Sequence, residues 1–194
     1  MHLIKNLNPT ALADLDNLSD LYGKYIVHDI IMVVGVLIGL KPVAMIGNNS
    51  ENRDIDAELI SDLGLRTAFW SEKNLTYVSF DQILANRMAE LHRTVWGENT
   101  EHLEENREIG QLLGYPKTAV EYFVRRLELF KTGMPLPMLD VEDDENISEY
   151  FLEMILSPEH YKAEIAEYCR PLEKAVQQYA PKTYALICAL SSRS

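Results

Sequence analysis

Lys117 and Thr118 stand at the predicted start of a helix and carry groups that can bind phosphate or carboxylate. Free backbone N–H groups and the helix dipole favour an anion at such a helix N-terminus. Arg125 and Arg126 follow about two turns later, and arginine adds bidentate contacts to an anion. The predicted helix over residues 116–131 is the only locally basic helix of the sequence. We therefore identify these four residues as candidate anion-binding residues.

The residues just before this helix also fit a simple joint between two helices. Gly114 can adopt the left-handed conformation that ends a helix. Pro116 suits the first turn of the next helix, because its missing N–H costs nothing there. Tyr115 lies between them, where its ring can cover the corner. The spacing predicts that Gly114 is left-handed and that Pro116 is the first residue of a helix, with or without a bound anion.

Two short elements, "GLKP" at residues 39–42 and "LGYP" at residues 113–116, resemble a group of conserved but uncharacterised archaeal proteins. In that group a Gly-Leu-Lys-Pro element precedes a Leu-Gly-Tyr-Pro-x-Cys-Cys element at a helix start. Thr118 and Ala119 stand where that pattern has its two cysteines. The resemblance implies no established activity, and any metal or redox chemistry of paired thiols is missing from this chain.

A histidine flanked by carboxylates occurs further upstream, in a predicted helix over residues 98–113. Glu98, His102 and Glu105 fall at i, i+4 and i+7, a spacing that can bind a divalent metal. A di-metal helical bundle, however, needs Glu-x-x-His motifs from two helices, and the sequence contains none. A solvated acidic face explains the cluster more simply. We therefore predict no metal at these residues and no other cofactor.

His160, Glu164 and Glu167 repeat the same spacing on a later predicted helix. Because Ile165 and Tyr168 belong to the apolar stripe of that helix, we expect His160 and Glu164 to lie beside it, toward solvent, as a surface pair. If this cluster met the first one in space, two histidines and several glutamates would form a site. The sequence leaves that alternative open.

Motifs of known catalytic chemistry are missing from the sequence. Gly-x-Ser-x-Gly, the P-loop and Gly-x-Gly-x-x-Gly do not occur. The neighbours His28 and Asp29 could form an acid–base pair, but Asp29 also fits a helix cap without any catalytic partner. Cys169 and Cys188 lie in apolar helical segments, where cysteines are more often core residues than nucleophiles.

The composition restricts the partners and the compartment. Thirty Asp and Glu residues against 18 Lys and Arg give a formal charge of −12, a field that makes nucleic acid an unfavourable partner. Two cysteines do not form a disulfide framework. The N-terminus lacks the apolar stretch of a secretion signal, and the apolar run at residues 30–40 is shorter than the roughly 20 residues of a membrane span. We expect a cytoplasmic protein without a membrane segment.

The first part of the chain predicts a small sheet packed against helices. Residues 29–40 are apolar without interruption, so periodicity allows a buried strand or a buried helix, and their length favours the helix. A short strand over residues 43–47 and a hairpin over residues 65–70 and 75–80 bring the sheet to about three strands.

All segments after residue 81 read as helices. One of them is predicted over residues 147–156, and Pro171 is expected to kink or break a later one. An acidic run at residues 140–145 could pair with the basic helix instead of a ligand. The sequence thus predicts an α+β fold dominated by helices. We expect one domain over residues 1–194, divided into an α+β part (1–80) and a helical part (81–194).

The last predicted helix places four apolar side chains close to the end of the chain: Tyr184, Leu186, Ile187 and Leu190. Little chain remains to cover them, so we predict a homodimer through the C-terminal helices. Docking of this helix on the chain's own core is the alternative that the sequence leaves open.

These features favour a soluble intracellular protein that binds a protein partner or a small anionic ligand, rather than a catalyst. The alternative is a small enzyme that acts on a phosphate- or carboxylate-bearing substrate, with or without a metal.

Overall fold

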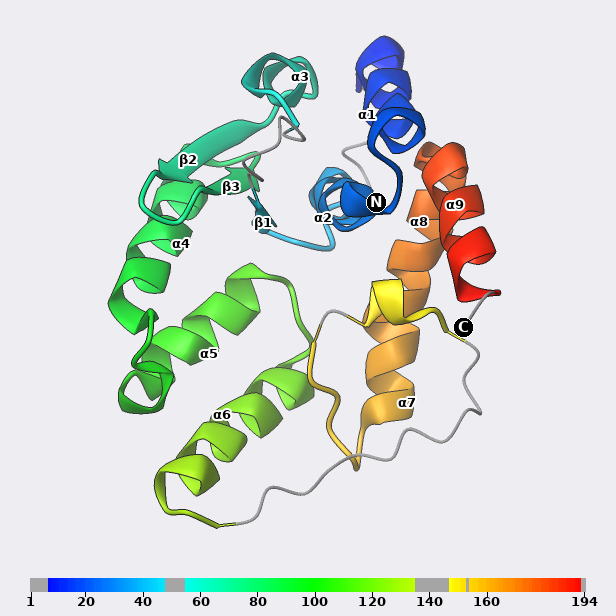
Figure 1. The fold of residues 1–194 in the computed structure, drawn as a ribbon. Coiled ribbons are helices and arrows are strands. Elements are labelled where there is room, and N and C mark those ends of the chain that lie inside the picture. The colour runs from blue at the N-terminus through cyan, green and yellow to red at the C-terminus, as the bar shows by residue number, and fades with distance from the viewer. Residues whose placement is uncertain (1–6, 48–54, 135–146, 153, 193–194) are drawn as a thin grey trace.

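The structure, a computed structural model, describes residues 7–47, 55–134, 147–152 and 154–192 (Figure 1). The first half contains α1 (Pro9–Tyr22), α2 (Val27–Leu37), β1 (Ala44–Gly47), α3 (Ala57–Asp62), β2 (Arg66–Trp70), β3 (Leu75–Ser79) and α4 (Gln82–Val95). The second half contains α5 (Leu103–Leu112), α6 (Lys117–Lys131), α7 (Tyr161–Glu164), α8 (Arg170–Tyr179) and α9 (Pro181–Ser191). The predicted α+β class, with helices dominant and a three-stranded sheet in the first half, is confirmed.

The sheet separates two hydrophobic cores. Its strands are antiparallel in the order β1-β3-β2. Successive side chains of a strand point to opposite faces, so Tyr77 packs with α4 while its neighbour Val78 packs with α2. Figure 1 shows α4 along one side of the sheet and α2 on the other.

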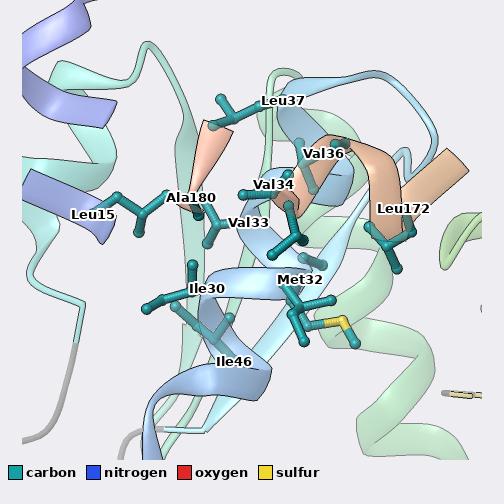
Figure 2. Close-up of a cluster of buried hydrophobic side chains, with 14 of the residues drawn as sticks. Leu15, Ile30, Met32, Val33, Val34, Val36, Leu37, Ile46, Leu172 and Ala180 are labelled. Atoms are coloured by element: carbon teal, nitrogen blue, oxygen red, sulfur yellow. The ribbon is translucent and has the colours of Figure 1, made fainter. Parts of the chain in front are cut away.

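Helix α2 is the centre of the larger core. Every residue of α2 except His28 is buried, and a helix that is apolar on all sides must be enclosed on all sides. Figure 2 shows its side chains between Leu15 of α1, Ile46 of β1 and Leu172 of α8. The apolar run that allowed helix or strand is therefore a helix, enclosed by both halves of the chain. In the described part of the chain, no helix is long and apolar enough to cross a membrane.

The predicted joint between α5 and α6 is present, but the second helix begins one residue later than predicted. Gly114 is left-handed, with φ +77°. Pro116 has φ −52° and ψ 139° and precedes the helix as its cap, so α6 begins at Lys117 and not at Pro116. The carbonyl of Pro116 accepts the first helical bond, from the Val120 N–H at 3.1 Å.

The elements "GLKP" and "LGYP" contact each other through Lys41. Lys41 is 1% exposed, and its ammonium donates to the Leu113 carbonyl at 3.4 Å. The ammonium also lies 5.1 Å and 5.2 Å from the ring centroids of Tyr115 and Tyr168. Its aliphatic stem fills the notch above Gly35, where a Cβ would come within 2.7 Å of Lys41 Cδ.

Two predicted helices of the second half are wrong. Residues 98–113 form a 3-10 turn, Asn99–Glu101, and a separate helix α5. In the range 147–156, the described residues form only one helical turn, the 3-10 turn Glu149–Phe151. Phe151 is fully buried in the larger core, and tertiary packing of this kind overrides local helix propensity.

Pro171 does not break the helix in which it lies. Helices α7 and α8 are continuous through a π-helical turn, Ile165–Cys169. Proline removes one backbone donor and its ring crowds the preceding turn, and a wider π turn accommodates both effects.

The apolar residues at the chain end pack on the protein itself. Helix α9 lies against α1 and α8, Ile187 is buried, and Tyr184, Leu186 and Leu190 are half-buried. Asp16 of α1 fixes this position, because its carboxylate accepts the Lys182 N–H at 3.0 Å and the Thr183 N–H at 2.9 Å. The side chains that motivated the homodimer are thus partly covered within one chain, and the homodimer stays a prediction.

Replacement of Gly114 by alanine is expected to lower the free energy of unfolding by more than about 3 kcal/mol. The new Cβ would collide with the Leu40 carbonyl oxygen and lie 3.0 Å from Lys41 Cα. Gly64→Ala is the matched control, because Gly64 has φ +75° with open space at its Cβ position, and only about 1 kcal/mol of strain is expected. Urea unfolding measures both, and equal losses would contradict a tight contact at Gly114.

Candidate functional site

All four predicted anion-binding residues line one groove. Lys117, Thr118, Arg125 and Arg126 form one wall along α6, and the turn at residues 157–160 forms the other. The groove has a volume of about 500 Å³, within the range of small-molecule sites. We call it the α6 groove.

The charge of the α6 groove is positive although the protein is acidic. In the described residues no ion pair is recorded for Lys117, Arg125 or Arg126. Glu121 lies on the same wall, but both of its carboxylate oxygens accept from Arg107, at 2.9 Å and 3.2 Å. The hydrogen bonds of Arg107 to Glu104 and to Glu121 raise the pKa of Arg107 above its ordinary value. Three cations of α6 therefore face the groove, and the carboxylate on the same wall is already paired. Glu159 is the carboxylate of the opposite wall, so the positive charge lies on the α6 side.

The start of α6 adds backbone donors to this wall. No side chain caps the helix, and the first N–H bonded within it belongs to Val120. No hydrogen bond is recorded among the described residues for the N–H groups of residues 117–119, as is usual at an uncapped helix N-terminus. Lys117 and Thr118 line the groove at this end.

The middle of the groove is less polar. Tyr122 and Pro158 line it from opposite walls, and the Arg126 guanidinium lies 6.0 Å from the Tyr122 ring centroid. Lys117 and Arg125 are eight residues apart, about 12 Å along a helix. The arrangement suits an elongated ligand with an anionic group at the start of α6 and a flat or apolar part beside Tyr122.

The opposite wall is held by a buried glutamate. Glu164 was expected beside His160, toward solvent, but it is 1% exposed. Its Oε2 accepts from the backbone N–H of Ser157 at 2.8 Å, and its Oε1 has no hydrogen-bond partner among the described atoms. His160 is exposed and lines the groove. His160 and Glu164 therefore do not form the expected surface pair. The imidazole of His160 lines the groove, and the carboxylate of Glu164 supports the turn at residues 157–160.

No protein-family model, curated protein or solved structure matches this chain. The resemblance carried by residues 39–42 and 113–116 therefore stays a prediction. What the fold adds is that these two elements contact each other beside the start of α6.

The cluster around His102 has the geometry of surface ion pairs. Glu98 and Glu105 do not share a helix, because α5 begins at Leu103. Glu98 lies 3.8 Å from Nε2 of His102, whereas Glu105 lies 3.6 Å from Nδ1. The carboxylates approach different sides of the ring, where one metal ion cannot meet both. No group of three His, Cys, Asp or Glu side chains in the described part is placed to hold a metal, so the two histidine clusters do not combine.

The remaining sequence candidates are placed apart from the groove. Cys169 is buried as expected, but Cys188 is exposed, so its expected core position is wrong. Asp29 does not cap α2. It lies in the first turn, is buried, and accepts from the Gly47 N–H of β1 at 3.3 Å, which ties α2 to the sheet.

A buried tyrosine–histidine pair was missed by the sequence analysis. Tyr77 Oη lies 3.0 Å from Nδ1 of His92. Burial raises the pKa of Tyr77 to about 12, and burial lowers the pKa of His92. The available signal was the position of His92 one turn after Met88 in α4, on the apolar side that also carries Val95.

His92 is expected to make the protein less stable in mild acid. Burial lowers the pKa of His92 in the folded protein, so the folded imidazole binds a proton less readily than the unfolded chain, whose ordinary pKa is about 6.5. The contribution of His92 to the free energy of unfolding is therefore complete above that pH and is lost as the pH falls below it. Between pH 7.5 and 5.5, the unfolding free energy of wild type should fall by about 1 kcal/mol more than that of His92→Gln. Identical pH dependence in urea unfolding would reject this role.

Proposed function

We propose that this protein binds a small phosphate- or carboxylate-bearing ligand in the α6 groove, and that it acts as a binding protein. The observation that supports this proposal is the meeting of Lys117, Arg125 and Arg126 with an uncapped helix start on one groove. In a chain of formal charge −12, such a local positive site attracts a small anion, while the overall field opposes a polyanion.

Different residues of the α6 groove would bind the charged part and the flat part of the ligand. Lys117 supplies a point charge next to the backbone N–H groups, where an anion gains from both. Arg125 offers planar bidentate contacts further along the groove. Tyr122 provides a ring on which a flat part of the ligand can lie. Because the groove is open to water, its affinity should fall as ionic strength rises.

An enzyme acting on an anionic substrate is the second candidate, and His160 favours it. Imidazole is the side chain most suited to proton transfer near neutral pH, and His160 lines the wall opposite α6. Glu164 does not bond to His160, because its carboxylate accepts from the backbone N–H of Ser157.

The acidic run at residues 140–145 lies outside the described residues, so its pairing with α6 stays a prediction. This run could compete with the ligand, since its five carboxylates could neutralise the same cations. A variant with Asn and Gln in place of these carboxylates tests this competition. Tighter anion binding by that variant would show competition for the groove.

Anion binding is expected to depend on Lys117 and Arg125 but not on an arginine elsewhere. We would titrate inorganic phosphate, citrate and adenosine monophosphate by calorimetry at constant ionic strength. Lys117→Ala and Arg125→Ala should each weaken the best probe at least about tenfold, as expected for a lost charge-assisted bond of about 1.5 kcal/mol. Arg66→Ala removes the same charge from exposed β2 and should leave affinity unchanged.

Two results would reject the proposal. One is the absence of saturable binding for every probe, both in wild type and in the neutralised acidic-run variant. The other is an equal loss in Arg66→Ala, because general charge attraction would then explain the binding. Constant ionic strength matters here, because salt screens exposed charges and would itself change the affinity.

A further inference from the structure

A second cavity lies behind α6, on the face turned away from the groove. It has a volume of about 290 Å³ and is lined by residues of α4, α5 and α6, by Asn99 and by residues 154–155. Helix α6 contributes Ala119, Val120 and Phe123 to this cavity, whereas Lys117 and Arg125 line the groove. At 3.6 residues per turn these two sets lie on opposite sides of the helix. We call this space the inner cavity.

The inner cavity is mainly apolar, with a small polar region on one wall. Val95, Ile109 and Leu113 contribute aliphatic side chains, and the polar residues of the lining are His92, Asn99, Asn106 and Tyr115. The Asn106 amide nitrogen donates to the carbonyls of Asn99 and His102, at 2.9 Å and 2.7 Å, which fixes the orientation of the amide. Cavities of this kind bind small apolar molecules and select them by a few placed polar groups.

The pairing with Tyr77 determines which nitrogen of His92 carries the proton. Tyr77 is fully buried, and Nδ1 of His92 is the only hydrogen-bond partner recorded for its hydroxyl in the described part of the chain. If Nδ1 donated to the phenol oxygen, the phenol hydrogen would have no acceptor, which is strongly unfavourable in a buried site. The phenol therefore donates to Nδ1, and the imidazole proton is on Nε2.

The Nε2–H of His92 is consequently an available donor. No hydrogen bond to Nε2 is recorded among the described residues, and Nε2 is not among the buried polar atoms that lack a partner. It is therefore open to a small molecule, and the ring that carries it lines the inner cavity.

We propose that the inner cavity binds a small, neutral, mainly apolar molecule with a carbonyl group, whose oxygen accepts from His92 Nε2–H. An apolar cavity of about 150 Å³ holds benzene, so the inner cavity has room for an aromatic ketone. A neutral carbonyl is favoured over a carboxylate because an apolar wall stabilises an anion poorly. The lowered pKa of His92 agrees with a neutral imidazole donor. This site does not depend on an anion in the α6 groove.

The test compares acetophenone with α-methylstyrene, which has the same shape but no carbonyl oxygen. Dissociation constants come from NMR titrations of the full chain. The ratio of the two affinities should fall about fivefold to tenfold in His92→Phe, as expected for one lost hydrogen bond. His160→Phe is the matched control, because His160 lines the groove and not the inner cavity, and it should keep the wild-type ratio.

Two further measurements keep the proposal testable if His92→Phe does not fold. Ala119→Phe places a ring in the inner cavity and should abolish binding of both probes. In wild type, the ¹⁵N resonances of His92 should show the proton on Nε2, and acetophenone should shift that resonance. A proton on Nδ1, no saturable binding of acetophenone, or an unchanged ratio in His92→Phe would each overturn the proposal.

Discussion

The constraint on which the rest of the fold depends is the burial of α2. A helix with apolar residues on every side is stable only when other elements enclose it completely. Here the sheet covers one side and helices from both ends of the chain cover the others. Burial of about ten mainly apolar side chains supplies the main stabilising term, at roughly 25 cal/mol per Å² removed from water. The C-terminal helices are therefore required by a segment that lies more than a hundred residues earlier.

Lys41 connects the buried helix α2 to the start of α6, where the candidate site lies. It lies four residues after the end of α2, and its stem packs against Gly35 of that helix. Its ammonium then holds the Leu113 carbonyl and the Tyr115 ring, so the joint before α6 is tied to α2. A buried ammonium is costly unless carbonyls and aromatic rings replace its water, and the two tyrosine rings supply part of that replacement. The start of α6 is consequently positioned by the core rather than by the surface.

The sequence predicted those features that depend on neighbours along the chain. The left-handed Gly114, the hairpin and the cationic side of α6 all follow from local spacing, and each is present. The features that were missed depend on distant contacts. Phe151 pulls its segment into the core and prevents a helix. Glu164 is buried because Ser157 offers it a backbone donor. The pair of Tyr77 and His92 joins a strand to a helix. The periodicity of a single sequence does not show how a strand and a helix are placed relative to each other.

Helix α6 is the shared wall of two different environments, and the segment after residue 153 closes both of them. Residues 154–155 border the inner cavity, whereas residues 157–160 border the groove. The anion binding proposed for the groove rests on charges exposed to water, which salt screens over about 8 Å at physiological ionic strength. The binding proposed for the inner cavity rests on apolar area and one neutral donor, which salt hardly affects. Changing the ionic strength should therefore distinguish the two proposed sites in one sample. Any dependence of one affinity on the other ligand must pass through this common wall, and by linkage it must be equal in both directions.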